Sequence, residues 1–191
     1  MKIRNGFVSN SSSSSFIIAF PKKPESAAEL MRILFPGKRG KDFFAVIDED
    51  KSELLSYKKV SEIIFNDLVQ NKPIILDDLT NDDYYSLSNG RIGNSITSSE
   101  NPQISAIHHI LYTRGYDTVE EKERKQLYDK LEKLHIENGK NVMEWFRSNI
   151  KETDVIYRLE YGNEDSDDPC RPIIEFSNTF DNLKHIYINN H

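Results

Sequence analysis

The sequence lacks the features of a secreted, disulfide-bonded protein and those of a membrane protein. Its single cysteine, Cys170, cannot form a disulfide bond within the chain. One free thiol fits a reducing compartment. The first apolar run, residues 16–20, is too short for the hydrophobic segment of a signal peptide or for a membrane span. We therefore expect a cytoplasmic protein that does not associate with membranes.

Excess positive charge is also missing. The chain has 25 lysines and arginines against 31 aspartates and glutamates, which gives a net charge of −6. Nucleic acids and anionic membranes attract cationic surfaces, and the small basic patch at residues 38–41 is typical of a solvated loop. The composition therefore predicts no broad nucleic-acid binding.

Complete metal-binding and phosphate-binding motifs are absent from the sequence. No Gly-x-x-x-x-Gly-Lys-Ser/Thr loop is present. The acidic residues 163–168 depart from a calcium loop, because Asp168 and Ile174 stand where that loop needs glycine and glutamate. His108 and His109 are adjacent, so on a helix they point about 100° apart and cannot share a metal ion. We expect one of them to be packed and the other exposed. The sequence predicts no metal site and identifies no cofactor.

The most unusual feature that is present is a serine-rich run over residues 6–16, Gly-Phe-Val-Ser-Asn-Ser-Ser-Ser-Ser-Ser-Phe. Residues 16–20, closed by Pro21, are typical of a buried strand. Because the run is short and lies between two apolar anchors, we predict an ordered turn rather than a free tail.

The function of this run has several alternatives. It can be a solvated spacer, a concave nest of backbone N–H groups and hydroxyls that binds an anion, or the source of a nucleophile that needs a nearby base. Modification of the serines, for example by phosphorylation, is a further alternative. The candidate anion-binding residues are Ser9, Asn10, Ser12, Ser14 and Ser15. The candidate catalytic residues are Ser11, Ser13, Glu175 and His191.

Residues 4–16, Arg-Asn-Gly-Phe-Val-Ser-Asn-Ser-Ser-Ser-Ser-Ser-Phe, resemble the opening of a loose group of bacteriophage and phage-related bacterial proteins. Those proteins share this serine-rich motif and diverge after it, so the resemblance covers only the N-terminal end of the chain. It implies a phage context, and hence the host cytoplasm for a phage-encoded protein. It implies no activity and no catalytic residues.

The pattern of the remaining chain predicts one α+β domain over residues 1–191. We expect a mostly antiparallel sheet built from N-terminal and C-terminal strands, with a helical middle section packed on one face. Helices are predicted to begin near Ser26, Ser56, Asn101, Thr118 and Val142, and Asn138 and Gly139 are predicted to end the helix that begins near Thr118. Trp145 lies on an apolar stripe and is predicted to be buried. Residues 77–100 lack periodicity and predict a long loop.

Three C-terminal strands, at residues 155–161, 173–176 and 184–188, predict an antiparallel meander. The last of them would present His185, Tyr187, Asn189 and His191 on one polar face, as on an exposed edge strand. We also predict that the strand at residues 16–20 lies beside this last strand, which would bring residues 11–15 close to His191.

From these features we expect a phage-type accessory protein that acts by binding a protein partner. The alternative is a small enzyme or ligand-binding protein for a phosphorylated molecule, which would use the turn at residues 11–15 and the C-terminal histidines. The sequence leaves the ligand, the oligomeric state and the presence of enzymatic activity open.

Overall fold

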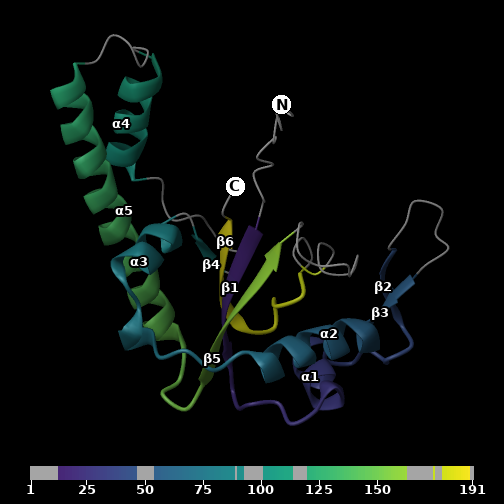
Figure 1. Ribbon diagram of the computed structural model, residues 1–191. Helices are drawn as coiled ribbons and strands as arrows, with labels where there is room; N and C mark the ends of the chain where they lie inside the picture. Colours follow the sequence, from purple (N-terminus) through teal and green to yellow (C-terminus); the bar gives the residue numbers. More distant parts are fainter. Residues whose placement is uncertain are drawn as a thin grey trace, which may run out of the picture.

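The computed structural model describes residues 13–46, 54–88, 90–92, 101–113, 120–162, 174 and 178–189. Four antiparallel strands form the central sheet, in the order β4-β6-β1-β5 (Figure 1). They are β1 (Ser13–Phe20), β4 (Gly90–Ile92), β5 (Val155–Gly162) and β6 (Lys184–Asn189). The predicted α+β class, with a sheet made from both ends of the chain, is confirmed.

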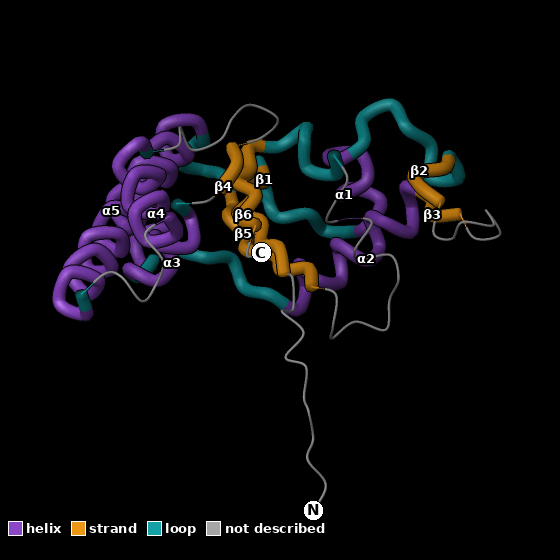
Figure 2. Tube along the Cα trace, turned by 90° about the horizontal axis from the view of Figure 1, so that it is seen from above, coloured by secondary structure: helices purple, strands orange, loops and turns teal. Residues whose placement is uncertain are grey.

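Strand β1 is central and is buried on both faces. Phe16, Ile18 and Phe20 pack into one hydrophobic core, whereas Ile17 and Ala19 pack into a second core on the other face. This two-sided burial is why the strand reads as a continuous apolar run rather than an alternating one. The prediction of helices on a single face is therefore wrong. Figure 2 shows helices on both sides of the sheet.

One face of the sheet is covered by α1 (Ala27–Leu34) and α2 (Tyr57–Gln70). The predicted caps are confirmed, because the Ser26 hydroxyl accepts a hydrogen bond from the Glu29 amide and the Ser56 hydroxyl from the Lys59 amide. A short antiparallel pair of strands, β2 (Phe43–Val46) and β3 (Leu54–Ser56), precedes α2.

The other face is covered by α3 (Asn81–Leu87) and α5 (Glu121–Asn149), and α4 (Pro102–Thr113) packs against α5. Figure 1 shows α4 and the first half of α5 extending together away from the sheet as a helical arm. Its own small core consists of Ile107, Leu111 and Leu131. None of the described helices combines the length and apolar character needed to span a bilayer.

The predicted long loop at residues 77–100 is wrong over its first part. A 3₁₀ turn, η1 (Leu76–Asp78), is followed by α3 and then by β4. Helix α3 is stabilised by a reciprocal cap, in which the Thr80 hydroxyl accepts from the Asp83 amide and the Asp83 carboxylate accepts from the Thr80 amide. Residues 93–100 lie outside the described residues. The extent of a single domain over residues 1–191 stays a prediction.

Helix α5 is continuous over 29 residues, so the predicted helix end near Asn138 and Gly139 is wrong. The predicted burial of Trp145 is also wrong, because 41% of this residue is exposed. Its neighbours Val142 and Phe146 are buried against the sheet. Trp145 precedes Phe146 by one position and so points about 100° away from that buried face.

The predicted C-terminal meander is wrong as well. Strand β1 lies between β5 and β6, with Ile18 opposite Tyr157 on one side and opposite His185 on the other. Of the predicted strand at residues 173–176, only Ile174 is described, and it is buried with helical backbone. A strand that is apolar on both faces is stable only in the middle of a covered sheet, which separates the two C-terminal strands.

Candidate functional site

The serine-rich run is described from Ser13 onward, and there it is a strand rather than the predicted turn. The side chains of Ser14 and Ser15 are buried, and the Ser14 hydroxyl lies 3.0 Å from the Tyr187 hydroxyl. Successive amides of a strand point to opposite neighbours and do not converge on one anion. This geometry does not favour an anion nest at Ser14 and Ser15. The roles assigned to the run stay predictions.

The remaining predicted site residues lie outside the described residues. They are Ser9, Asn10, Ser11, Ser12, Glu175 and His191. The predicted neighbourhood of the two end strands is confirmed, because β1 pairs with β6 in antiparallel register and places Ser14 opposite Asn189. The approach of the serine run to His191 stays a prediction.

His185 is a buried residue of the sheet, and the predicted exposed edge strand is wrong. Strand β6 lies between β1 and β4, so neither of its sides is an edge. The His185 Nδ1–H donates to the Leu183 carbonyl at 3.1 Å, and the ring lies against Phe16 and Phe180. His185 therefore packs in the core on this face of β6.

A second buried histidine, His135 on α5, forms a polar cluster with the end of α3. Its Nδ1 lies 2.6 Å from the Ser88 hydroxyl. The Asn138 side-chain amide donates to the Ser88 carbonyl at 3.0 Å and contacts the Ser88 hydroxyl at 3.4 Å. No local sequence pattern points to this cluster, because its partners are 47 and 50 positions apart.

A serine beside a neutral histidine is the pairing that activates a nucleophile. Here only 2% of Ser88 and 5% of His135 are exposed, so a substrate has no direct access to the hydroxyl. The cluster instead holds α3 against α5 through hydrogen bonds that satisfy buried polar groups. Burial lowers the pKa of His135, and the charge of His108 lowers it further.

The His135 pKa predicts a dependence of stability on pH. The folded protein favours neutral His135, whereas the unfolded chain takes up the proton near the ordinary value of 6.5. The stability that the folded protein gains from neutral His135 is therefore fully present above pH 6.5. It is lost as the pH falls through 6.5 towards the lower pKa of the folded state. Denaturant unfolding across this range should show the loss.

A matched pair of variants isolates the effect of His135. His135→Gln should flatten the fall in stability near pH 6.5, whereas His109→Gln, at an exposed position of α4, should leave it unchanged. An equal slope in wild type and His135→Gln would show that another group titrates.

His135 is also the centre of a line of aromatic rings that crosses three helices. Its ring lies 4.7 Å from that of Tyr85 on α3 and 6.0 Å from that of His108 on α4. The His108 ring lies 6.2 Å from that of Tyr112. We call Tyr85, His135, His108 and Tyr112 the aromatic strip. Its two ends are accessible, since 40% of Tyr85 and 82% of Tyr112 are exposed.

The prediction that His108 and His109 differ in packing is confirmed: His108 is half-buried in the strip and His109 is exposed. Among the residues that the structure describes, no three histidine, cysteine or acidic side chains are grouped to hold a metal ion. The strip therefore offers ring surfaces and hydroxyls rather than a set of metal ligands.

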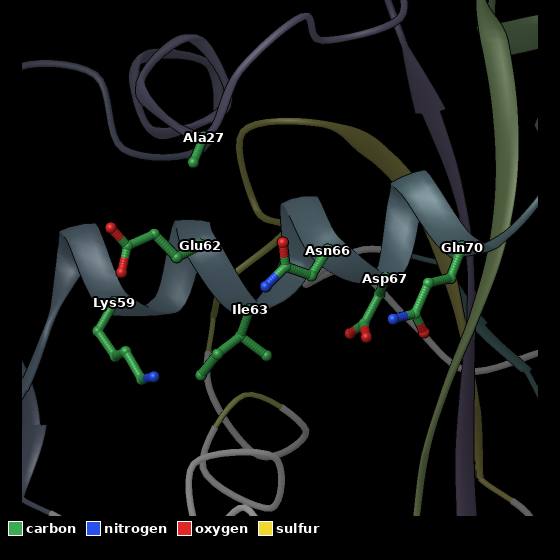
Figure 3. A pocket seen from close by; sticks show the side chains of 7 residues that line it. All are labelled: Ala27, Lys59, Glu62, Ile63, Asn66, Asp67 and Gln70. Carbon is green, nitrogen blue, oxygen red and sulfur yellow. The ribbon is translucent and has the colours of Figure 1, made fainter.

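A polar groove of about 490 Å³ runs along α2. Its lining residues are Ala27, Lys59, Glu62, Ile63, Asn66, Asp67 and Gln70. In Figure 3, Glu62 extends on the side of Ala27, whereas Lys59 and Asp67 extend on the opposite side of the helix. The charged groups do not converge on one point, so the groove is a weaker candidate than the aromatic strip.

No family model, curated protein or solved structure matches this chain. The function of the protein must therefore be inferred from the described residues themselves. Among these, the aromatic strip combines exposed ends with a fixed centre.

Proposed function

We propose that this protein acts by binding a protein partner through the aromatic strip. The observation that carries the proposal is the 82% exposure of Tyr112 at one end of a continuous series of ring contacts. Exposed aromatic side chains contribute large contact areas at a low entropic cost, and they are enriched in protein interfaces. The resemblance of the N-terminal run to phage proteins supports an accessory role in the host cytoplasm.

The strip has a fixed support, which favours binding because few groups must be ordered on association. His135 is held by Ser88, and Tyr85 lies against the His135 ring. Tyr112 follows Leu111, whose side chain packs in the small core of the helical arm. The helix backbone therefore fixes the position of Tyr112, although its own side chain is exposed.

The chemistry of the strip defines the partner surface that would fit it. The rings of Tyr85 and Tyr112 require an apolar pocket, and their hydroxyls require a hydrogen-bonding group at its edge. The acidic balance of the chain argues against a nucleic acid as this partner. A folded protein surface with an apolar pocket meets both requirements.

A crosslinking experiment tests the proposal in the cells that produce the protein. A photoreactive phenylalanine analogue at position 112 should give one dominant crosslinked partner. The same analogue at Lys151, an exposed position beyond the C-terminal end of α5, should not give it. Identical products at both positions, or none at position 112, would refute the proposed surface.

Affinity measurements with the purified partner make the test quantitative. Tyr112→Ala should weaken binding at least about tenfold, as expected for an aromatic anchor at an interface. Tyr112→Phe removes only the hydroxyl and should have a smaller effect. Unchanged affinity in both Tyr112→Ala and Tyr85→Ala would place the partner on another surface.

The alternative proposal is a small enzyme or ligand-binding protein for a phosphorylated molecule. One observation favours it: the pairing of β1 with β6 brings the serine-rich end and the C-terminal end of the chain to neighbouring strands. Titrations with phosphate, nucleotides and divalent metals test it, with His191→Ala as the control. If none of these ligands binds, the pairing of β1 with β6 has only a structural role.

A further inference from the structure

A second pocket lies on the opposite side of the sheet from the aromatic strip. It has a volume of about 450 Å³, which is within the usual range for small-molecule sites. We call it the aromatic pocket. It is lined mainly by Phe35, Lys38, Phe44, Tyr57, Asn178 and Asn182.

Three aromatic rings from different elements form its wall. Phe35 ends α1, Phe44 belongs to β2, and Tyr57 begins α2. Their ring centres lie 4.7 Å apart for Phe35 and Tyr57, 5.3 Å for Phe44 and Tyr57, and 5.4 Å for Phe35 and Phe44. Because each ring contacts the other two, the wall is held in one geometry.

The wall also leaves ring surface accessible. Phe35 is buried, but Phe44 and Tyr57 are only half-buried. Phe44 lies at a β-bulge, where the pairing of β2 with β3 skips from Phe43 to Ala45. Bulges are frequent beside binding sites because they redirect a side chain. Because the Phe44 and Tyr57 rings are inclined at 82° to each other, a planar ligand can stack on one of them and meet the other at its edge without displacing the core.

The polar groups of the pocket complement an anionic, hydrogen-bonding ligand. The Lys38 ammonium lies 5.6 Å from the centre of the Tyr57 ring. The Asn182 side-chain amide donates to the Leu34 carbonyl at 2.8 Å, which fixes the orientation of this side chain. Asn178 supplies a second amide, and none of the described lining residues is acidic. Lys38 is therefore the single charged residue among the described residues that line the pocket.

We propose that the aromatic pocket binds a nucleoside monophosphate. Stacking of a planar base on aromatic rings, hydrogen bonds from amides to the edge of the base, and one cation for the phosphate are the interactions that such a ligand needs. One lysine matches one phosphate group better than a longer, more charged phosphate chain. This site is distinct from the aromatic strip and from the serine-rich run.

Calorimetric titration of the full chain tests the proposal, with NMR observation of the Phe44 and Tyr57 rings. The probes are the 5′-monophosphates of adenosine, guanosine, cytidine and uridine, the nucleoside adenosine, and inorganic phosphate. At least one monophosphate should bind more tightly than adenosine and more tightly than inorganic phosphate, and it should shift both ring signals.

Three variants separate the contributions of charge and stacking. Lys38→Gln should weaken monophosphate binding about tenfold, the effect of losing one charge-assisted contact, and leave adenosine binding unchanged. Phe44→Leu should weaken both. Lys151→Gln, which removes the same charge from an exposed position in the turn after α5, should change neither.

Several outcomes would overturn the proposal. One is the absence of binding for all four monophosphates. Another is equal affinity for inorganic phosphate together with no effect of Phe44→Leu, which would indicate a surface anion contact only. Binding that survives both Lys38→Gln and Phe44→Leu would place the ligand elsewhere. If Phe44→Leu fails to fold, Asn178→Asp at an exposed position replaces it, and its added negative charge should weaken monophosphate binding.

Discussion

Replacing Gly139 with alanine is expected to lower the free energy of unfolding by about 2 kcal/mol or more, since overpacking typically costs about 1–3 kcal/mol and occasionally more. A Cβ atom at position 139 would lie 1.7 Å from the Tyr84 carbonyl oxygen and 2.6 Å from its carbonyl carbon. Both are backbone atoms, so no side-chain rotation can relieve the clash. Helix α3 would have to move away from α5.

The same substitution also has a stabilising effect, which is smaller than the cost of the clash. Alanine is more favourable than glycine in a helix interior by about 1 kcal/mol. Asn141→Ala provides a matched control, because position 141 is exposed on the same helix and gains helix propensity without a clash. Denaturant unfolding should show a lower midpoint for Gly139→Ala and an unchanged or higher midpoint for Asn141→Ala. A Gly139→Ala midpoint equal to wild type would show that α3 does not pack this closely.

The role of Gly139 also shows a limit of sequence reasoning. Asn138 followed by Gly139 is a common signal for the end of a helix, and it predicted two helices where α5 is continuous. The glycine is needed for a different reason, the close approach of the Tyr84 backbone. Asn138 is likewise used for its hydrogen bond to the Ser88 carbonyl. Both reasons depend on a contact between distant segments, which a local pattern does not contain.

Local signals did predict the elements that depend on local chemistry. The caps at Ser26 and Ser56 were predicted from hydroxyls that precede helical stripes, and both hydroxyls accept the expected bonds. The strand at residues 16–20 was predicted from its apolar run. The run did not predict that the two faces of the strand pack against different helices. A continuous apolar run predicts burial, but it does not identify the neighbouring elements.

The two surfaces that carry the functional proposals were not predicted from the sequence. The aromatic strip joins α3, α5 and α4, and the aromatic pocket joins the end of α1, β2, the start of α2 and residues 178–182. Each surface takes at most three residues from any one segment, so no segment carries a recognisable motif. Candidate site residues were predicted in the serine-rich run because an unusual local composition can be recognised from the sequence alone. Its described part, Ser13–Phe20, is the central strand of the sheet.

Phe146→Ala should produce a further large loss, of about 3–5 kcal/mol in the free energy of unfolding, as expected when a fully buried phenylalanine is replaced by alanine. None of the Phe146 surface is exposed. It packs in the core that also contains Ile17 of the central strand and Val142 of α5. Removing the ring leaves a cavity between α5 and the sheet, which closely packed neighbours fill only in part.

The adjacent residue is the matched control for this prediction. Trp145→Ala removes a larger side chain but should cost less than about 1 kcal/mol, because substitutions at exposed positions have small effects and 41% of Trp145 is accessible. Trp145 is the only tryptophan in the chain, so its fluorescence reports the unfolding of wild type and Phe146→Ala, and circular dichroism reports all three proteins. If Trp145→Ala proved as destabilising as Phe146→Ala, helix α5 would have to be rotated relative to the sheet. The rotation would also move His135 and the aromatic strip, so this pair of variants tests the surface proposed for the partner as well as the core.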